Sequence, residues 1–258
     1  MLRNNIEDNK KNIFYVPVEK CCNFYGFNYS KKNWHPFTKQ VEQIIENPKI
    51  DYNNSVIKDF RKKIKQKGFN KVILLNKDIE LGKYIPDKVK RKVKESESRI
   101  PRPIVPYRIE DNLNDPKYYY YPKNDFFRED NHVSRLKEIY FSMKEEGFKP
   151  EKFNGFSSYF IRGVLLKKES DYRFVVVGGR HRIAVLAALG YEQIPVTFHD
   201  NQHKGLKWPQ VLDINNIENF PIVRNDIYPK ELTKEIFNLY FETCGLERAK
   251  MLNILRKD

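Results

Sequence analysis

A chain of 258 residues with a formal net charge of +14 is long enough for one large domain, or for a smaller domain with sizeable extensions. Its cysteines, Cys21, Cys22 and Cys244, offer neither a disulfide framework nor the paired spacing of a zinc site, which favours a reducing, cytoplasmic compartment. The polar N-terminus lacks the apolar region of a signal peptide, and no apolar run approaches a membrane span, so we expect a soluble protein.

The positive charge is concentrated in the first half of the chain. Residues 58–99 contain fifteen lysines and arginines against six acidic residues, whereas residues 199–258 hold nine of each. Such a segment can attract nucleic acid, an anionic membrane face or a phosphorylated substrate. A solvated, lysine-rich helix explains the same residues, so the partner of this segment stays open.

The N-terminal half predicts one helix, one strand and one connection. The helix covers residues 54–68 and can be capped by Asn54 or Ser55. Its apolar face is formed by Ile57, Phe60 and Ile64. The apolar run KVILLN at residues 71–76 predicts a buried strand, and the prolines of residues 83–106 indicate a surface connection.

From residue 132 onward the pattern alternates between helix and strand. In chain order it predicts a helix over 132–148, β-rich runs over 159–166 and 172–177, a core helix over 180–190, and a strand over 194–198. The two β-rich runs fit a hairpin around the five-residue loop KKESD. A last helix begins at about Pro229. This order describes a compact α+β unit that is too small for a full doubly wound fold.

The junction between the second β-rich run and the core helix carries the clearest chemical signal. Its residues are Gly178, Gly179, Arg180, His181 and Arg182. A helix N-terminus offers unpaired N–H groups and a positive dipole end to a phosphate, and glycines let the ligand approach the backbone. The arginines can clamp phosphate oxygens, and the histidine can donate a hydrogen bond or move a proton. A tight glycine turn with surface ion pairs is the alternative, but cations disfavour a helix N-terminus unless an anion lies among them.

The segment VVVGGRHRIAVLAALGYEQIPV, residues 175–196, resembles the core signature of the ParB/sulfiredoxin superfamily. The resemblance covers about residues 130–200 and implies a compact mixed α/β core of that fold. We therefore expect a nucleotide-binding core over residues 106–200. A basic N-terminal extension of helix and strand over residues 1–105, which packs on the core, and a C-terminal loop and helix over residues 201–258 lie largely outside the resemblance.

Carried onto this chain, the resemblance implies which residues bind nucleotide phosphates. They are Gly178, Gly179, His181 and Arg182, with contributions from Arg135 and Ser142 on the preceding helix. Arg180 stands where sulfiredoxins have their catalytic cysteine, so sulfinic acid reduction is not expected. Against the partitioning proteins, the proline-interrupted segment 199–221 shows no helix-turn-helix, which argues against sequence-specific DNA partitioning.

The superfamily also includes small-molecule kinases and nucleotide-dependent switches. The pattern further resembles ParB-like proteins encoded among bacterial surface-polysaccharide genes. Phosphoryl transfer needs cations, usually Mg²⁺, and often a carboxylate that orients the acceptor. Glu129 and Asp130, with His132 nearby, are candidates for these roles, and Asp130 is the candidate Mg²⁺ ligand. Favourable negative charge at a helix N-terminus explains the same two carboxylates.

These observations favour a kinase-like phosphotransferase that uses ATP or ADP with Mg²⁺ and acts on a hydroxyl of a small molecule or glycan. Its catalytic residues would be Glu129, Asp130, Arg180 and His181, and the basic N-terminal half would help to form the acceptor site. The alternative is a ParB-like nucleotide switch or DNA-binding module. A nuclease is a third reading, for which the sequence offers no metal cluster of convincing spacing. The acceptor, the nucleotide preference and the oligomeric state stay open.

Overall fold

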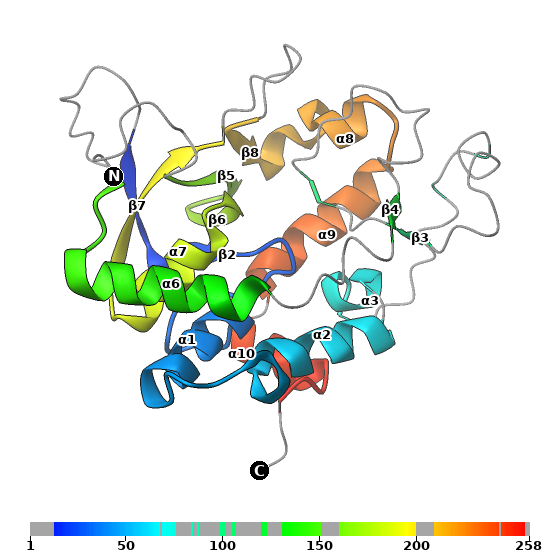
Figure 1. The fold of residues 1–258 in the computed structure, drawn as a ribbon. Coiled ribbons are helices and arrows are strands. Elements are labelled where there is room, and N and C mark those ends of the chain that lie inside the picture. The colour runs from blue at the N-terminus through cyan, green and yellow to red at the C-terminus, as the bar shows by residue number, and fades with distance from the viewer. Residues whose placement is uncertain are drawn as a thin grey trace.

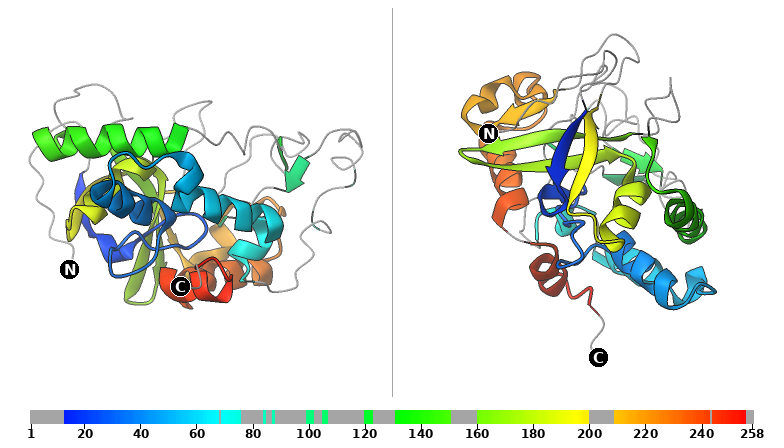
Figure 2. Two further views of the ribbon diagram at one scale, coloured as in Figure 1. Left: turned by 60° about the horizontal axis from the view of Figure 1, so that its bottom comes forward. Right: turned by 90° about the vertical axis from the view of Figure 1, so that its left-hand side faces the viewer.

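The computed structural model describes a large part of the chain, namely residues 13–67, 69–75, 84, 87, 99–101, 105–106, 120–122, 131–150, 160–199, 209–242 and 244–255. In this part a mixed β-sheet lies between helices on both of its faces (Figures 1 and 2). The expected α+β class is therefore confirmed at that level. Within the described ranges, no helix combines the length and the apolarity that crossing a membrane requires.

The sheet is assembled from three parts of the chain. Its six strands are β1 (Phe14–Pro17), β2 (Cys21–Cys22), β5 (Ile161–Lys168), β6 (Asp171–Gly178), β7 (Gln193–Phe198) and β8 (Val211–Asp213). The order is β1-β7-β5-β6-β2, and β8 pairs with β5. The pairs β1/β7 and β5/β6 are antiparallel, whereas β5/β7, β5/β8 and β2/β6 are parallel. A separate two-stranded ribbon joins β3 (Arg99–Pro101) to β4 (Tyr120–Pro122).

The N-terminal segment thus contributes two strands to the same sheet as the central unit. β1 pairs with β7, and β2 pairs with β6 at the other edge. The division of the chain at residues 105 and 200 stays a prediction.

Helices cover both faces of this sheet, as the right-hand view of Figure 2 shows. On one face lie α1 (Pro36–Glu46), α6 (Asn131–Glu146) and α7 (Arg180–Ala188), which pack against one another. The core on the other face is closed by α3 (Phe69–Ile73), the 3₁₀ segment η8 (Ile214–Asn219), α8 (Pro221–Arg224), α9 (Lys230–Glu242) and α10 (Gly245–Met251). Helix α2 (Val56–Lys67) contributes Ile57 to the first core and Phe60 to the second. The short 3₁₀ turns η1 (Val18–Lys20) and η2 (Tyr52–Asn54) connect the N-terminal elements.

Because both faces are covered, the central strands are buried on both sides. Alternate residues of β6 point in opposite directions, so Phe174 and Val176 enter one core and Val175 enters the other. Strands of this kind are nearly continuous apolar runs, which is why the sequence reveals them.

Most predicted elements of the central unit are confirmed. Between residues 130 and 200 the structure has α6, β5, β6, α7 and β7, in the expected order. Helix α7 is a core helix, since each residue from Ile183 to Ala188 is at most 3 % exposed. The helices expected over residues 54–68 and from about Pro229 are observed as α2 and α9.

The strand predicted for residues 71–76 is wrong. Helix α3 occupies residues 69–73, and Val72, Ile73 and Leu74 are buried as the apolar run requires. A short apolar run does not distinguish a buried strand from a buried helical turn. A distant residue stabilises the helical form, because the guanidinium of Arg248 donates to the carbonyl oxygen of Ile73 at 3.2 Å.

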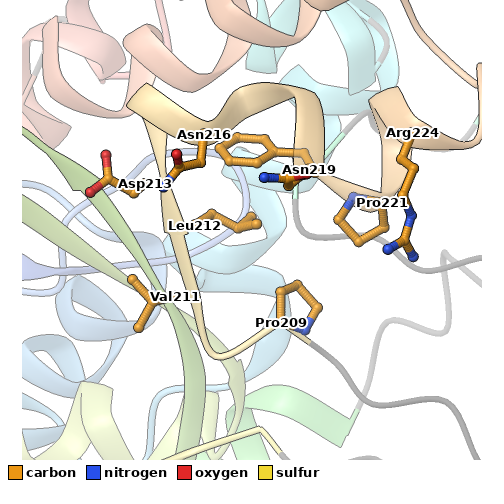
Figure 3. A pocket seen from close by; sticks show the side chains of 9 residues that line it. Pro209, Val211, Leu212, Asp213, Asn216, Asn219, Pro221 and Arg224 are labelled. Carbon is orange, nitrogen blue, oxygen red and sulfur yellow. The ribbon is translucent and has the colours of Figure 1, made fainter.

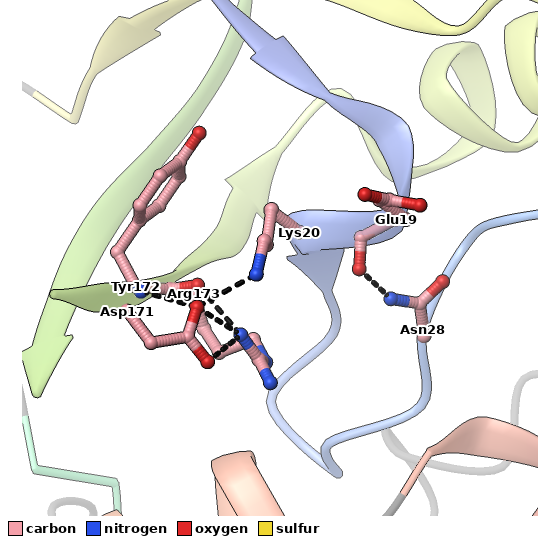
Figure 4. Close-up of polar contacts among 6 residues, drawn as sticks. All are labelled: Glu19, Lys20, Asn28, Asp171, Tyr172 and Arg173. Atoms are coloured by element: carbon pink, nitrogen blue, oxygen red, sulfur yellow. Dashed lines mark hydrogen bonds and ion pairs between the residues drawn. The ribbon is translucent and has the colours of Figure 1, made fainter. Parts of the chain in front are cut away.

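The five-residue hairpin loop is also wrong. Lys168 pairs with Asp171, so the turn contains only Glu169 and Ser170, and Glu169 has a positive φ of 53°. An ion-pair group lies beside this turn (Figure 4): Asp171 accepts from Lys20 at 2.7 Å and pairs with Arg173 at 2.8 Å. The carbonyl of Glu19, next to Lys20, accepts a hydrogen bond from the Asn28 side chain. The hairpin end is therefore attached to the segment between β1 and β2.

Candidate anion-binding site

The backbone between β6 and α7 turns at Gly179. This residue has a φ of 80° and a ψ of 22°, in the left-handed region that favours glycine, and its carbonyl accepts the N–H of Ile183 as the first bond of α7. A Cβ here would lie 3.0 Å from the Cα of Ile161. Gly179 therefore has a structural role in the turn, and it also leaves the first turn of α7 without a side-chain cap.

Gly178 makes room for Arg162, an arginine that is not among the predicted site residues. Arg162 lies opposite Gly178 in the β5/β6 register, and a Cβ on the glycine would lie 3.1 Å from both Nε and Nη2 of this guanidinium. Burial lowers the pKa of Arg162 from its ordinary value. Its position inside the apolar run YFIRGVLL, where a cation is out of place, is the signal that could have identified it.

His181 meets a second histidine, His132. Nδ1 of His132 lies 2.8 Å from Nε2 of His181, and the ring of Phe37 stacks on His181 at 5.1 Å with an interplanar angle of 6°. The ring of Phe37 is also 5.1 Å from that of His132. We refer to Phe37, His132 and His181 as the ring cluster.

The ring cluster brings together the N-termini of three helices. Phe37, His132 and His181 are the second residues of α1, α6 and α7, respectively. Each helix has a partial positive charge at this end. Three such ends in contact produce a positive potential that one helix alone does not provide, and this favours an anion.

A third histidine supports the cluster from beneath. His35 is the N-cap of α1, and its Nδ1 accepts the N–H of Phe37 at 3.2 Å. Its ring is 1 % exposed and stacks on Tyr29 at 3.8 Å. Burial, and secondarily the charge of Arg180, holds the pKa of His35 well below its ordinary value, so this histidine is neutral.

Four arginines surround the ring cluster, and they lower the pKa of its histidines. Burial lowers the pKa of His132 to about 4, with further contributions from Arg61 and Arg180. The pKa of His181 is lowered to about 3, first by burial and then by His132, Arg180, Arg135 and Arg182. Both rings are therefore neutral near pH 7, and the positive charge of the site comes from arginines on α2, α6 and α7.

These arginines differ in their surroundings. Arg135 pairs with Glu138 one turn along α6, at 2.8 Å, and both side chains are exposed. Arg180 is exposed, and it makes no hydrogen bond or ion pair with any residue that the structure describes. Since an exposed guanidinium at a helix N-terminus is electrostatically unfavourable, Arg180 is the side chain most available to an incoming anion.

The structure brings most of the predicted phosphate-binding residues to one place. Gly178, Gly179, Arg180, His181 and Arg182 form the start of α7, and Arg135 is close enough to affect His181.

Ser142 is not brought to this place. It lies exposed on α6, ten residues beyond His132, which corresponds to about 15 Å along the helix axis. Glu129 and Asp130, the predicted base and Mg²⁺ ligand, lie outside the described residues. In the part of the chain that the structure covers, no group of three or more His, Cys, Asp or Glu side chains gathers as a metal site would require.

Several contributors to the site carry no local sequence signal. His132 is predicted only as a neighbour of Glu129 and Asp130, and the sequence pattern does not indicate Phe37, His35 or Arg61. Contact between His132 and His181 joins residues 49 positions apart, and no local pattern reveals such a contact.

A separate pocket lies on the far side of the sheet, where β8 leads into η8 and α8 (Figure 3). Its lining combines prolines and apolar side chains with Asp213, two asparagines and an exposed arginine: Pro209, Val211, Leu212, Asp213, Asn216, Asn219, Phe220, Pro221 and Arg224. None of these belongs to the ring cluster or to the start of α7, so the pocket is not part of the candidate site.

Comparison of the chain with protein-family models, with curated proteins and with solved structures found no match.

Proposed function

We propose that this protein is a nucleotide-binding phosphotransferase of kinase type, which transfers a phosphoryl group to a hydroxyl of a small molecule or glycan. One observation carries the proposal: the N-termini of α1, α6 and α7 meet among Arg61, Arg135, Arg180 and Arg182, around histidines that are neutral. Nucleotide phosphates match this donor set, because they carry several negative charges and accept hydrogen bonds in many directions.

Each side chain of the site has a role in this scheme. The N–H groups at the start of α7 and the guanidiniums of Arg180 and Arg182 hold the phosphates and stabilise the charge that is transferred. His181 donates a hydrogen bond or moves a proton. The ring of Phe37 covers His132 and His181 on one side and excludes water from that side of the reacting groups.

A magnesium ion would neutralise charge on the phosphates when it is bound. The described residues of the site supply nitrogen donors, which suit phosphate rather than Mg²⁺. Magnesium therefore needs an oxygen ligand from elsewhere in the chain. The proposal assigns this role to Asp130 and the role of the base to Glu129.

A thermal-shift titration with ATP, ADP, CTP and GTP, each with and without Mg²⁺, tests nucleotide binding. A nucleotide at a hundred times its Kd stabilises the folded state by about 2.7 kcal/mol, which raises Tm by roughly 5 °C or more in a chain of this size. Arg180→Ala should weaken binding by about tenfold, since it removes a charge-assisted hydrogen bond. Arg224→Ala, an exposed arginine on α8, is the matched control and should bind as the unaltered protein does.

Product analysis then tests transfer. With ATP as the donor, ADP should accumulate faster when hydroxyl acceptors such as serine or a hexose are added, and with ADP as the donor, AMP should. If no nucleotide raises Tm and Arg180→Ala changes nothing, the proposal is wrong. If nucleotides bind but no acceptor accelerates their turnover, the nucleotide-switch alternative takes its place.

One observation favours that alternative, a ParB-like nucleotide-dependent DNA-binding protein. Lys58, Arg61, Lys62 and Lys65 follow the i, i+3, i+4, i+7 pattern and share one face of α2, and Arg61 is also near His132. Like charges at these spacings destabilise an isolated helix, and a polyanion would relieve the repulsion. Binding to duplex DNA that weakens steeply between 50 and 200 mM salt would support this function.

A further inference from the structure

Arg162 lies in the sheet at a place where a cation is costly. It is the second residue of β5, and its neighbours in this strand, Ile161, Val164 and Leu166, are 0 % exposed. A half-buried charge among apolar side chains is unfavourable unless an opposite charge or hydrogen-bond acceptors compensate it. Packing alone therefore does not explain an arginine at this position.

The residues around Arg162 adapt the sheet to its side chain. The register of β5 and β6 shifts between Arg162 and Gly163, so Val177 forms a β-bulge, a feature that re-aims side chains next to active sites. Gly163 allows the two strands to approach closely, since a Cβ there would overlap the carbonyl oxygen of Val175. The missing side chain of Gly178 leaves room for the guanidinium, whose Nε and Nη2 would lie 3.1 Å from a Cβ. This geometry directs the guanidinium to the end of β6.

Arg162 approaches the end of β6 from the face of the sheet that α7 does not cover. Ile161, the residue before it, packs in the core that contains α7. Val164 and Leu166, which point in the same direction as Arg162 along β5, pack in the core of the opposite face. The start of α7 and the side chain of Arg162 therefore lie on opposite faces of the sheet.

Gly178 and Gly179 connect these two faces. β6 ends at Gly178, and α7 begins two residues later at Arg180, whose Cα lies within about 8 Å of that of Gly178. Neither glycine has a side chain that would separate a ligand at the start of α7 from Arg162. A ligand that contacts both has to pass over the end of β6, so it has to be longer than a single phosphate.

We propose that Arg162 selects ligands with at least two linked phosphoryl groups, because it binds one group while the start of α7 binds the other. The inference rests on the proposed function and names the ligand class of that same site, a nucleoside di- or triphosphate in preference to a monophosphate. A guanidinium suits this task, since it stays charged near pH 7 and pairs bidentately with phosphate oxygens. Arg162 thus holds the phosphate chain, and Arg180 and Arg182 hold the group at the helix.

Isothermal titration calorimetry of the full chain, with sulfate and with inorganic pyrophosphate at equal ionic strength, tests the inference. Both anions can bind at the start of α7, but only pyrophosphate has a second group for Arg162. The unaltered protein should bind pyrophosphate at least about tenfold more tightly than sulfate. Arg162→Gln should weaken pyrophosphate binding by about tenfold, since it removes a charge-assisted hydrogen bond, and should change sulfate binding by less than about twofold.

Other variants separate ligand binding from structural effects. Arg180→Ala should weaken the binding of both anions, since both bind at the start of α7. Arg173→Gln is the matched control, because Arg173 lies at the other end of the same hairpin, where it pairs with Asp171 at 2.8 Å. It should leave both affinities within about twofold of the unaltered protein. Arg162→Lys keeps the charge but not the planar fork, and it should weaken pyrophosphate binding alone, by about threefold.

The outcomes distinguish this inference from the proposed function. If Arg162→Gln and Arg162→Lys bind pyrophosphate as the unaltered protein does, the inference is wrong and nucleotide binding stands. An equal loss of sulfate and pyrophosphate binding would also contradict it, since Arg162 would then support the site as a whole. If the unaltered protein binds neither pyrophosphate nor any nucleotide, both are wrong. Arg162→Lys decides the question even if Arg162→Gln does not fold.

Discussion

Arg248 and Arg180 carry the same charge at opposite ends of helices. Arg248 is 1 % exposed and donates to the carbonyl oxygens of Ile73 and Leu239, near the C-termini of α3 and α9, at 3.2 and 2.5 Å. A cation is favourable there, because the last carbonyls of a helix lack intrahelical partners. Arg180 begins α7, where a cation is unfavourable, and no described residue pairs with it.

The difference indicates what each arginine does. Carbonyl oxygens of the chain itself accept hydrogen bonds from Arg248. These bonds join α3 and α9 to α10, so the role of Arg248 is structural. The charge of Arg180 has no such partner in the described part of the chain, and a bound anion would supply one.

Replacing Arg248 should have the largest effect on stability. Arg248→Met keeps much of the side-chain volume but leaves the buried carbonyls of Ile73 and Leu239 without donors, so the free energy of unfolding should fall by about 3 kcal/mol. Urea denaturation measures the change. Arg224→Met, an exposed control on α8, should stay within about 0.5 kcal/mol of the unaltered protein. If Arg248→Met and Arg224→Met changed the free energy of unfolding equally, Arg248 would have no structural role.

Gly179→Ala tests the geometry beneath Arg180. The turn holds residue 179 in the left-handed region, which a Cβ disfavours, and the new Cβ would also lie 3.0 Å from the Cα of Ile161, so we expect a loss of about 2 kcal/mol. Gly190→Ala is the matched comparison, because Gly190 also has a positive φ but a Cβ there meets nothing within 4 Å. It should lose only about 1 kcal/mol, and thermal or urea unfolding of both proteins measures the difference.

Lowering the pH should reduce the free energy of unfolding, because His35 is neutral in the folded state. Since the pKa of His35 is lowered in the folded state, the unfolded state binds more protons below its ordinary pKa of about 6.5. Stability should therefore fall with pH from about 6.5 downward, by roughly 1.4 kcal/mol per pH unit for this residue. His35→Asn retains a capping side chain and should show a flatter pH dependence in urea unfolding at pH 5, 6 and 7. An unchanged slope would mean that His35 is not held neutral.

Arg180→Ala should have the smallest and most informative effect. Without ligand, removal of an exposed cation from the N-terminus of α7 should raise the free energy of unfolding slightly, by about 0.5 kcal/mol. With nucleotide present, the same variant should be less stable than the unaltered protein, because it binds more weakly. Parallel melts with and without ATP measure both effects, and a variant that is destabilised in both conditions would assign Arg180 a structural role instead.

The helices and strands that the sequence predicted correctly are those whose apolar pattern extends over a few neighbouring residues. Helices α6 and α9 repeat apolar side chains with the period of a helix, α7 is apolar on nearly every side after its first turn, and β5 and β6 are apolar runs between turn residues. The prediction over residues 71–76 was wrong, because a short apolar run fits a buried strand and a buried helical turn equally well. A hydrogen bond from Arg248 to the carbonyl oxygen of Ile73, and the packing of Val72, Ile73 and Leu74 in one core, stabilise a helical turn there.

The order of elements between residues 130 and 200, and a cationic glycine turn at the start of a buried helix, were set by the sequence alone. Both depend on spacings of a few residues, which determine which side chains share a face or an end. Only the tertiary structure decided that His132, Phe37, His35 and Arg61 join that turn, since their positions depend on how α1, α2 and α6 pack. It also decided which arginine the chain satisfies and which it does not, because carbonyl oxygens reach Arg248 from elements far away in the sequence.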